Sequence, residues 1–173
     1  GRDVFSLHVG TNDGWACMDI SNVQNDDNTC TEPESDPLVP DAECNAQSLV
    51  DLNNSPLGEL GNYLNLFLWK DDGDGVFEPP VETSLSSGLF GSGLSLPIHD
   101  STTGNGALVA STTEYIGSAW CAGVQNANIV TGVITCDGST MGNEAQTDSL
   151  IADIIFRAEQ VRNNPTFQCN PTP

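Results

Sequence analysis

The stretch Tyr63–Trp69, which reads YLNLFLW, is the segment that decides the expected fold. In an extended strand its leucines fall on one face, and the aromatic residues Tyr63, Phe67 and Trp69 fall on the other, because successive side chains alternate. A strand that is apolar on both faces is typical of the middle of a sheet that is covered on both sides. The stretch therefore predicts a central strand of a β-sandwich.

Further short segments rich in β-forming residues lie on both sides of this strand. They occur at residues 4–9, 15–20, 48–52, 107–111, 114–123 and 130–136. Gly, Pro, Asn and Asp residues separate them, as expected for strands joined by turns. Residues 89–98 are glycine-rich and are expected to be irregular, and residues 21–45, which are polar, acidic and proline-containing, are expected to form a long loop. This pattern predicts an all-β fold, an antiparallel β-sandwich with long disulfide-bonded loops.

The last apolar segment, residues 149–161 (SLIADIIFRAEQV), fits two secondary structures. Alternate residues from Leu150 to Ala158 form one apolar face of a strand, but Leu150, Ile154 and Ala158 also fall on one face of a helix. Asn163, Asn164 and Pro165 end either element. Periodicity alone leaves this choice open.

The charge balance excludes several classes of partner. The chain has 4 basic and 24 acidic residues, which gives a formal net charge of -20. Four cations are too few to build a basic groove for nucleic acid, and an anionic membrane surface should repel the chain. No run of about 20 apolar residues is present, so no membrane insertion is expected.

Six cysteines in a chain rich in Asn, Ser and Thr predict disulfides and an oxidising compartment. Six cysteines allow 15 pairings. We favour two short closures and a link between the chain's ends; the alternative is buried free thiols. The favoured pairs are Cys30–Cys44, Cys121–Cys136 and Cys17–Cys169. Asn53 begins the single Asn-x-Ser glycosylation sequon, which matters only if the protein is exported by a host that glycosylates.

The familiar catalytic motifs are missing from the sequence. There are only two histidines, His8 and His99, and neither belongs to an H-E-x-x-H zinc motif. The chain also lacks a G-x-S-x-G nucleophile elbow and a P-loop. These features predict a protein that is not an enzyme.

The acidic turn at residues 71–78 is the candidate metal site. Asp71, Asp72, Asp74 and Glu78 supply carboxylate oxygens, and intervening glycines allow a tight turn, which together suit calcium. The spacing departs from an EF-hand loop, because glycines occupy the third and fifth positions. The alternative is a solvated hairpin turn, for which Asp-Gly is a common signal.

Three blocks, taken in chain order, resemble one known family. They are NYLNLFLWKDDGDGVFEP (62–79), EYIGSAWC (114–121) and GNEAQTDSLIADIIFRAEQVRNNPTFQC (142–169). In this order they resemble the TasA/camelysin family of exported fibre-forming proteins with SipW-type signal peptides, which includes archaeal bundling pilins. The likeness covers roughly residues 57–169, with a looser match at WACMDIS (15–21). It departs at residues 21–45 and in the number of cysteines.

The resemblance implies a jelly-roll-like β-sandwich that is secreted to the extracellular space or cell surface and forms a homopolymer. It also implies that residues 149–160 form a strand. Residues 1–10 would be a donor strand that completes the sheet of the next subunit, with Val4, Phe5, Leu7 and Val9 as its polymerisation residues, and residues 11–173 would form one sandwich domain. The alternative for residues 1–10 is pairing within their own subunit. The alternative function is a monomeric calcium-dependent surface adhesin or carbohydrate-binding module.

Overall fold

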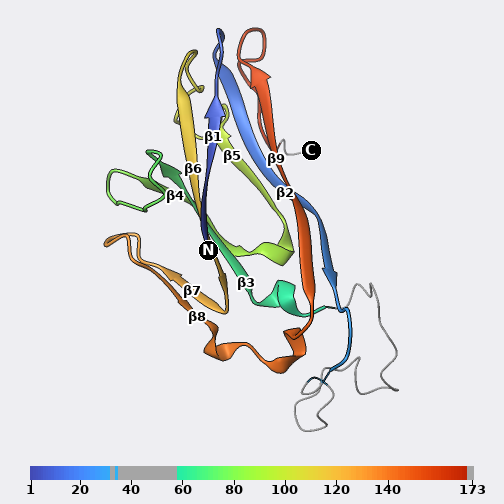
Figure 1. Ribbon diagram of the computed structural model, residues 1–173. Helices are drawn as coiled ribbons and strands as arrows, with labels where there is room; N and C mark the ends of the chain where they lie inside the picture. Colours follow the sequence, from blue (N-terminus) through green and yellow to red (C-terminus); the bar gives the residue numbers. More distant parts are fainter. Residues whose placement is uncertain (32–33, 35–57, 171–173) are drawn as a thin grey trace.

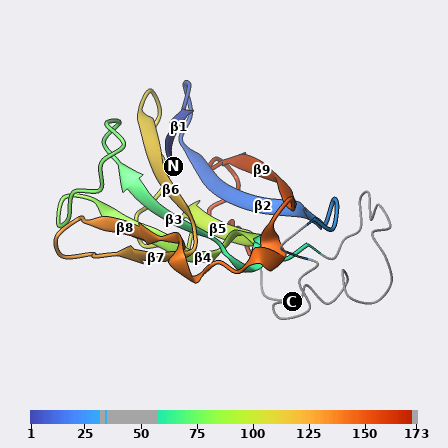
Figure 2. The same ribbon diagram turned by 60° about the horizontal axis from the view of Figure 1, so that its bottom comes forward.

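The computed structural model describes residues 1–31, 34 and 58–170 of the chain. Within these residues two antiparallel sheets face each other, and a smaller hairpin lies beside them (Figures 1 and 2). One sheet has the strand order β1 (Arg2–His8), β6 (Thr113–Ala122), β3 (Leu64–Asp71) and β4 (Thr83–Leu89). The other has the order β5 (Leu94–His99), β2 (Gly14–Asp26) and β9 (Ser149–Gln160), and the hairpin consists of β7 (Val124–Ala127) and β8 (Ile134–Asp137). The predicted all-β antiparallel sandwich is confirmed.

The helical content of the described residues is limited to single turns of 3-10 helix. These turns are η1 (Leu60–Asn62), η2 (Phe90–Ser92), η3 (Gly138–Thr140) and η4 (Asn143–Ala145). No helix in the described residues has the length and apolar character needed to cross a bilayer.

Strand β3 occupies the central position that its sequence predicts, between β6 and β4. Its leucines Leu66 and Leu68 enter the core between the two sheets, where they meet residues of β2, β5 and β6. Its aromatic residues Phe67 and Trp69 face the opposite side, where they pack with Phe77 and Ala119 beneath the β7–β8 hairpin. Both faces of β3 are therefore buried, which explains why it lacks the polar alternation of a surface strand.

The aromatic cluster on the outer face of β3 forms a second, smaller core. The ring centroids of Phe67 and Trp69 lie 5.6 Å apart, and Phe77 meets Phe67 edge-on at 5.1 Å. The hairpin is joined to β6 by the disulfide Cys121–Cys136, whose sequence separation is 15 residues. Closing a loop of this length stabilises a fold by roughly 3 kcal/mol in the chain-entropy model. The disulfide and the aromatic cluster together hold the hairpin over the sheet.

The ambiguous segment at residues 149–161 is a strand, as the resemblance implies. Strand β9 pairs antiparallel with β2 over most of its length, from Ser149 opposite Asp26 to Gln160 opposite Gly14. The two long strands lie side by side in both views (Figures 1 and 2). Backbone pairing with β2 decides against the helix, since the apolar periodicity fits both structures.

The structure corrects several expected boundaries. Residues 107–111 do not form a strand; Leu108 makes only an isolated bridge to Gly14. Residues 21–26 belong to β2 and not to the expected loop, because they pair with the start of β9 across a bulge. The glycine-rich stretch 89–98 is less irregular than expected, since it contains the end of β4 and most of β5. The expected strand at residues 48–52 lies outside the described residues.

Two of the three predicted disulfides are confirmed. Cys17 on β2 is bonded to Cys169 near the end of the described chain, across a sequence separation of 152 residues. Cys121–Cys136 is the second. Cys44 of the third predicted pair, Cys30–Cys44, lies outside the described residues. The sequon at Asn53 also lies outside them. The disulfides are consistent with an oxidising compartment rather than the cytoplasm.

Replacing Gly117 on β6 by alanine should destabilise the fold. A Cβ atom at this position would lie 2.1 Å from Cε2 of Trp69, a side chain with no exposed surface. We expect Gly117→Ala to lower the free energy of unfolding by roughly 1–3 kcal/mol, because a packed indole has no room to move. Urea denaturation followed by tryptophan fluorescence measures the change.

The matched control is Gly88→Ala on β4, where an added Cβ would meet nothing within 4 Å. That variant should keep the stability of the wild type to within about 1 kcal/mol. Equal effects at both positions would contradict the view that the Trp69 contact limits residue 117.

Candidate functional site

The first candidate site is the N-terminal strand itself. Within the single chain β1 pairs antiparallel with β6, in a register that places Phe5 opposite Ile116 and Leu7 opposite Glu114. Phe5 and Leu7 are half-buried and pack against the main core, and the Phe5 ring lies 5.5 Å from that of Phe156 on β9. In the single chain, β1 therefore pairs within its own subunit, which is the alternative that the sequence left open for residues 1–10.

The predicted polymerisation residues do not all share one face. Val4 is 39% exposed and points away from the core, toward Gly75 of the acidic turn. Val9 is half-buried and lies just beyond β1, where its backbone bonds with Thr112 and Ser111. Phe5 and Leu7 are therefore the two side chains through which β1 contributes to the core.

Strand β1 is an edge strand, and so is β9 in the opposite sheet. A largely apolar groove of about 640 Å³ opens between the two sheets next to both strands. Residues that line it include Phe5 on β1, Trp120 on β6, and Leu150 and Ile154 on β9. A second groove of about 510 Å³ continues beside Leu7 and Phe156. This side of the sandwich is thus less tightly closed than its centre.

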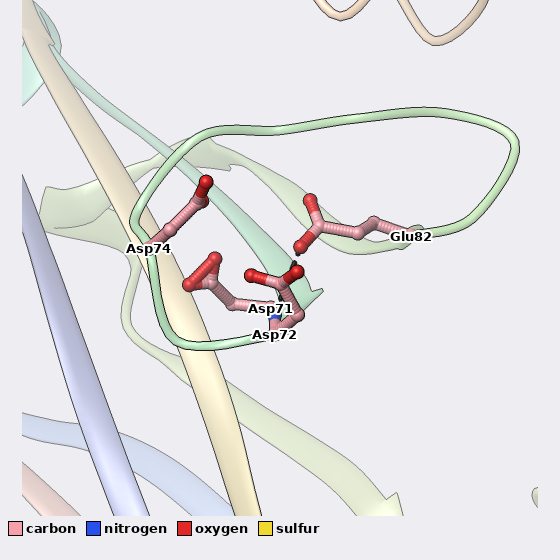
Figure 3. A group of neighbouring side chains, drawn as sticks. All are labelled: Asp71, Asp72, Asp74 and Glu82. Carbon is pink, nitrogen blue, oxygen red and sulfur yellow. Dashed lines mark hydrogen bonds between the residues drawn. The ribbon is translucent and has the colours of Figure 1, made fainter.

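The acidic turn between β3 and β4 is the second candidate site. The carboxylates of Asp71, Asp72, Asp74 and Glu82 point toward one another inside the loop, as Figure 3 shows, with one oxygen from each lying within 4.8 Å of the others. Gly73 and Gly75 have φ angles of 115° and 75°, in the left-handed region that a residue with a side chain rarely adopts. The two glycines let the loop bend around its own carboxylates.

The structure changes one member of the predicted ligand set. Glu82, four residues further on, joins the three aspartates, whereas Glu78 is outside the group. Glu82 is 8% exposed, and its two oxygens accept hydrogen bonds from the backbone N–H groups of Asp72 (2.9 Å) and Glu78 (2.8 Å). Glu82 is not in the predicted set, although it is the twelfth residue counted from Asp71, the position at which an EF-hand loop places its last ligand.

The carboxylates inside the loop lie close enough to raise the cost of ionising them together. Burial raises the pKa of Glu82, and the charges of Asp71 and Asp72 add to the effect, although the two backbone hydrogen bonds oppose it. Neighbouring carboxylates of like charge are costly to ionise together, and a hard divalent cation relieves that cost. The oxygen-only donor set and its glycine turns fit calcium.

A third polar cluster, which sequence reasoning missed, links the two sheets at one end of the core. Lys70 Nζ on β3 lies 2.6 Å from Glu114 Oε1 on β6 and 2.9 Å from His99 Nε2 on β5. His99 Nε2 also lies 3.3 Å from Glu114 Oε1, and His99 Nδ1 donates to the Gly106 carbonyl at 2.9 Å. His99 is a buried residue at the end of β5. The cluster holds three strands together through charged hydrogen bonds.

Comparisons with known proteins identify no relative. No family model, no curated protein and no solved structure matches this chain. The TasA/camelysin resemblance therefore stays a prediction from the quoted blocks.

Calcium should stabilise the protein through the acidic turn. A ligand that binds only the folded state raises its stability with concentration, so millimolar calcium should raise the melting temperature, by about 2–4 °C for each kcal/mol of binding energy. Glu82→Gln should remove most of this response because it deletes a buried charged ligand. Differential scanning fluorimetry with calcium and with a chelator gives the measurement.

Glu78→Gln is the matched control, since Glu78 is in the same loop but outside the carboxylate group. It should keep the calcium response. A melting temperature that calcium and chelator leave unchanged in the wild type would mean that the loop is only a solvated turn.

Glu114 should make the stability depend on pH in the acid range. Its hydrogen bond with His99 and its ion pair with Lys70 lower the pKa of Glu114 from 4.5 to about 2, although burial opposes this. A lowered folded-state pKa contributes stability that is complete above pH 4.5 and is lost as the pH falls toward 2. The difference in unfolding free energy between wild type and Glu114→Gln should therefore shrink by about 1–3 kcal/mol over this interval. Urea denaturation at several pH values tests this, and a constant difference would contradict it.

Proposed function

We propose that this protein is a structural subunit of an extracellular filament, assembled head-to-tail by donation of the N-terminal strand. The observation that carries the proposal is the place of β1: among the described residues it is an edge strand that pairs with β6 alone, and it nevertheless supplies Phe5 and Leu7 to the core. An edge strand with a single neighbouring strand can leave its own sheet and enter that of another copy while the remaining strands stay paired.

The incoming strand would repeat the contacts that β1 makes in a single chain. Phe5 and Leu7 face the core only in the register observed with β6, because a shift by one residue would turn both side chains to solvent. Fully burying two such side chains would contribute on the order of 3–6 kcal/mol. Phe5 and Leu7 are half-buried, so they contribute only part of this, in addition to the backbone hydrogen bonds. The arrangement with a donated strand and the one with the intramolecular strand would therefore be close in free energy. Exchanging one for the other would cost little free energy once assembly begins.

Donation in one direction leads to a filament. Each subunit gives its strand to the next copy and receives one from the previous copy, so the contact joins two different surfaces. Such heterologous contacts extend indefinitely when the rotation between subunits does not close a ring. The disulfides Cys17–Cys169 and Cys121–Cys136 suit a fibre that persists in an oxidising compartment outside the cell.

A disulfide that locks β1 to its own β6 should prevent assembly. Ser6 and Tyr115 are directly opposed in the β1–β6 register, so cysteines at both positions can form such a lock. The oxidised double variant Ser6→Cys/Tyr115→Cys should form no filaments, whereas the wild type and both single variants should form them. Negative-stain electron microscopy and sedimentation distinguish these outcomes.

Selective reduction of the lock should restore assembly, with wild-type protein treated in the same way as the control for the native disulfides. Deletion of residues 1–9 should likewise leave a domain that does not assemble. Filaments of normal length from the locked variant or from the deletion would contradict strand donation.

A second candidate function is a calcium-dependent surface adhesin or carbohydrate-binding module that acts as a monomer. The observation in its favour is the convergence of Asp71, Asp72, Asp74 and Glu82 in a loop at the end of a rigid sheet. Monomeric protein at high concentration that binds glycans only in the presence of calcium would support this function over the filament.

A further inference from the structure

We propose that β9 is a second, independent interface, through which two copies of this chain pair edge to edge around a two-fold axis. Strand β9 is 12 residues long, and among the described residues it pairs with β2 alone, along one edge. A long edge strand with unpaired backbone groups is a template for pairing with another chain. Strand donation by β1 leaves this edge open, because β1 pairs with β6.

The side chains of β9 are unusually apolar for an exposed edge. Ile151 is 58% exposed, Ile155 41% and Ile154 39%, although soluble proteins commonly protect such edges with charge or proline. Ile151 and Ile154 both border the apolar groove that Trp120, itself 46% exposed, also lines, whereas Ile155 is absent from its lining. The exposed isoleucines are thus gathered along one edge strand.

The sequence of β9 is complementary to itself in one antiparallel register. When Ile155 lies opposite Ile155 of the second copy, Asp153 lies opposite Arg157 and Arg157 opposite Asp153. The same register places Ile154 opposite Phe156 on the groove side, so apolar residues meet there too. Opposite charges and apolar pairs directly across two strands stabilise an antiparallel sheet.

Neighbouring registers lack this complementarity. Centring the pair on Phe156 would oppose Asp153 to Glu159, and centring it on Asp153 would oppose two aspartates. Centring it on Ile154 would place Asp153 opposite Ile155 and leave the charges without partners. The charge pattern of the strand therefore selects Ile155 as the residue on the two-fold axis.

Arg157 is already held in position for a second carboxylate. Its guanidinium donates to Asp19 on β2 and to the Cys169 carbonyl (3.2 Å), which fixes it on the outer face of the sheet. A guanidinium has five N–H donors, so it can bond to Asp19 and to Asp153 of a second copy together. A second copy is thus the occupant whose charges match this edge, even though each chain carries a net charge of -20.

Cysteine cross-linking of the full-length protein tests the register directly. Under a mild oxidant, Ile155→Cys should form covalent dimers on a non-reducing gel, because residue 155 meets its own copy at the axis. Ile151→Cys is the matched control on the same strand. Residue 151 lies opposite residue 159, about 27 Å from its own copy, so it should form few dimers even though it is the more exposed position.

A charge placed on the axis gives an independent measurement. Ile155→Lys should weaken dimerisation at least about tenfold in analytical ultracentrifugation, since two lysines would face each other. Val124→Lys, at a position 54% exposed on β7, should leave it unchanged. Cross-linking at residue 151 equal to that at residue 155, or no effect of Ile155→Lys, would overturn the proposal. Both measurements are made in the locked Ser6→Cys/Tyr115→Cys background, which should form no filaments, as well as in the wild type, so they do not depend on filament formation.

Discussion

The burial of β3 on both faces is the constraint on which the rest of the fold depends. The leucines of β3 require a second sheet on one side, and β2 and β5 supply it with Met18, Ile20 and Ile98. Its aromatic residues require a cover on the other side, and the β7–β8 hairpin supplies that cover with Ala127 and Ile134. Gly117 on β6 has no side chain because the indole of Trp69 occupies the space. One strand therefore determines the placement of both sheets and of the hairpin.

The same arrangement leaves the edges of the sheets as the surfaces through which the protein can pair with another chain. A central strand that is buried on both faces has no surface to offer, whereas β1 and β9 each keep one unpaired edge among the described residues. In the proposed filament β1 supplies a strand to the next subunit, and in the further proposal β9 joins copies laterally. The two edges belong to different sheets but border the same groove. Together the two contacts would build a fibre that also associates sideways.

The charge of the chain limits how these contacts can work. With a net charge of -20, two copies repel each other at a distance, so association needs local complementarity or apolar burial. Phe5 and Leu7 provide apolar burial for β1, and Asp153 with Arg157 provides charge complementarity for β9. The carboxylates of the acidic turn add repulsion within one loop, and calcium would remove part of it. Each proposed contact thus includes a means of offsetting the negative charge.

The sequence by itself predicted the fold class, the central strand and two of the disulfides. Alternating apolar residues and the short Cys121–Cys136 closure are local patterns, whereas Cys17–Cys169, which spans 152 residues, was predicted only as the pair that the short closures leave. The sequence also located the acidic turn and predicted a strand at residues 4–9. Tertiary structure alone decided three things. It selected a strand for residues 149–160, whose periodicity fits a helix equally well, because β2 offers a partner along its whole length. It replaced Glu78 by Glu82 in the carboxylate group, because the loop returns on itself. It also brought Lys70, His99 and Glu114 together from three strands, since contacts between distant segments are fixed by how the sheets pack and leave no pattern in the sequence.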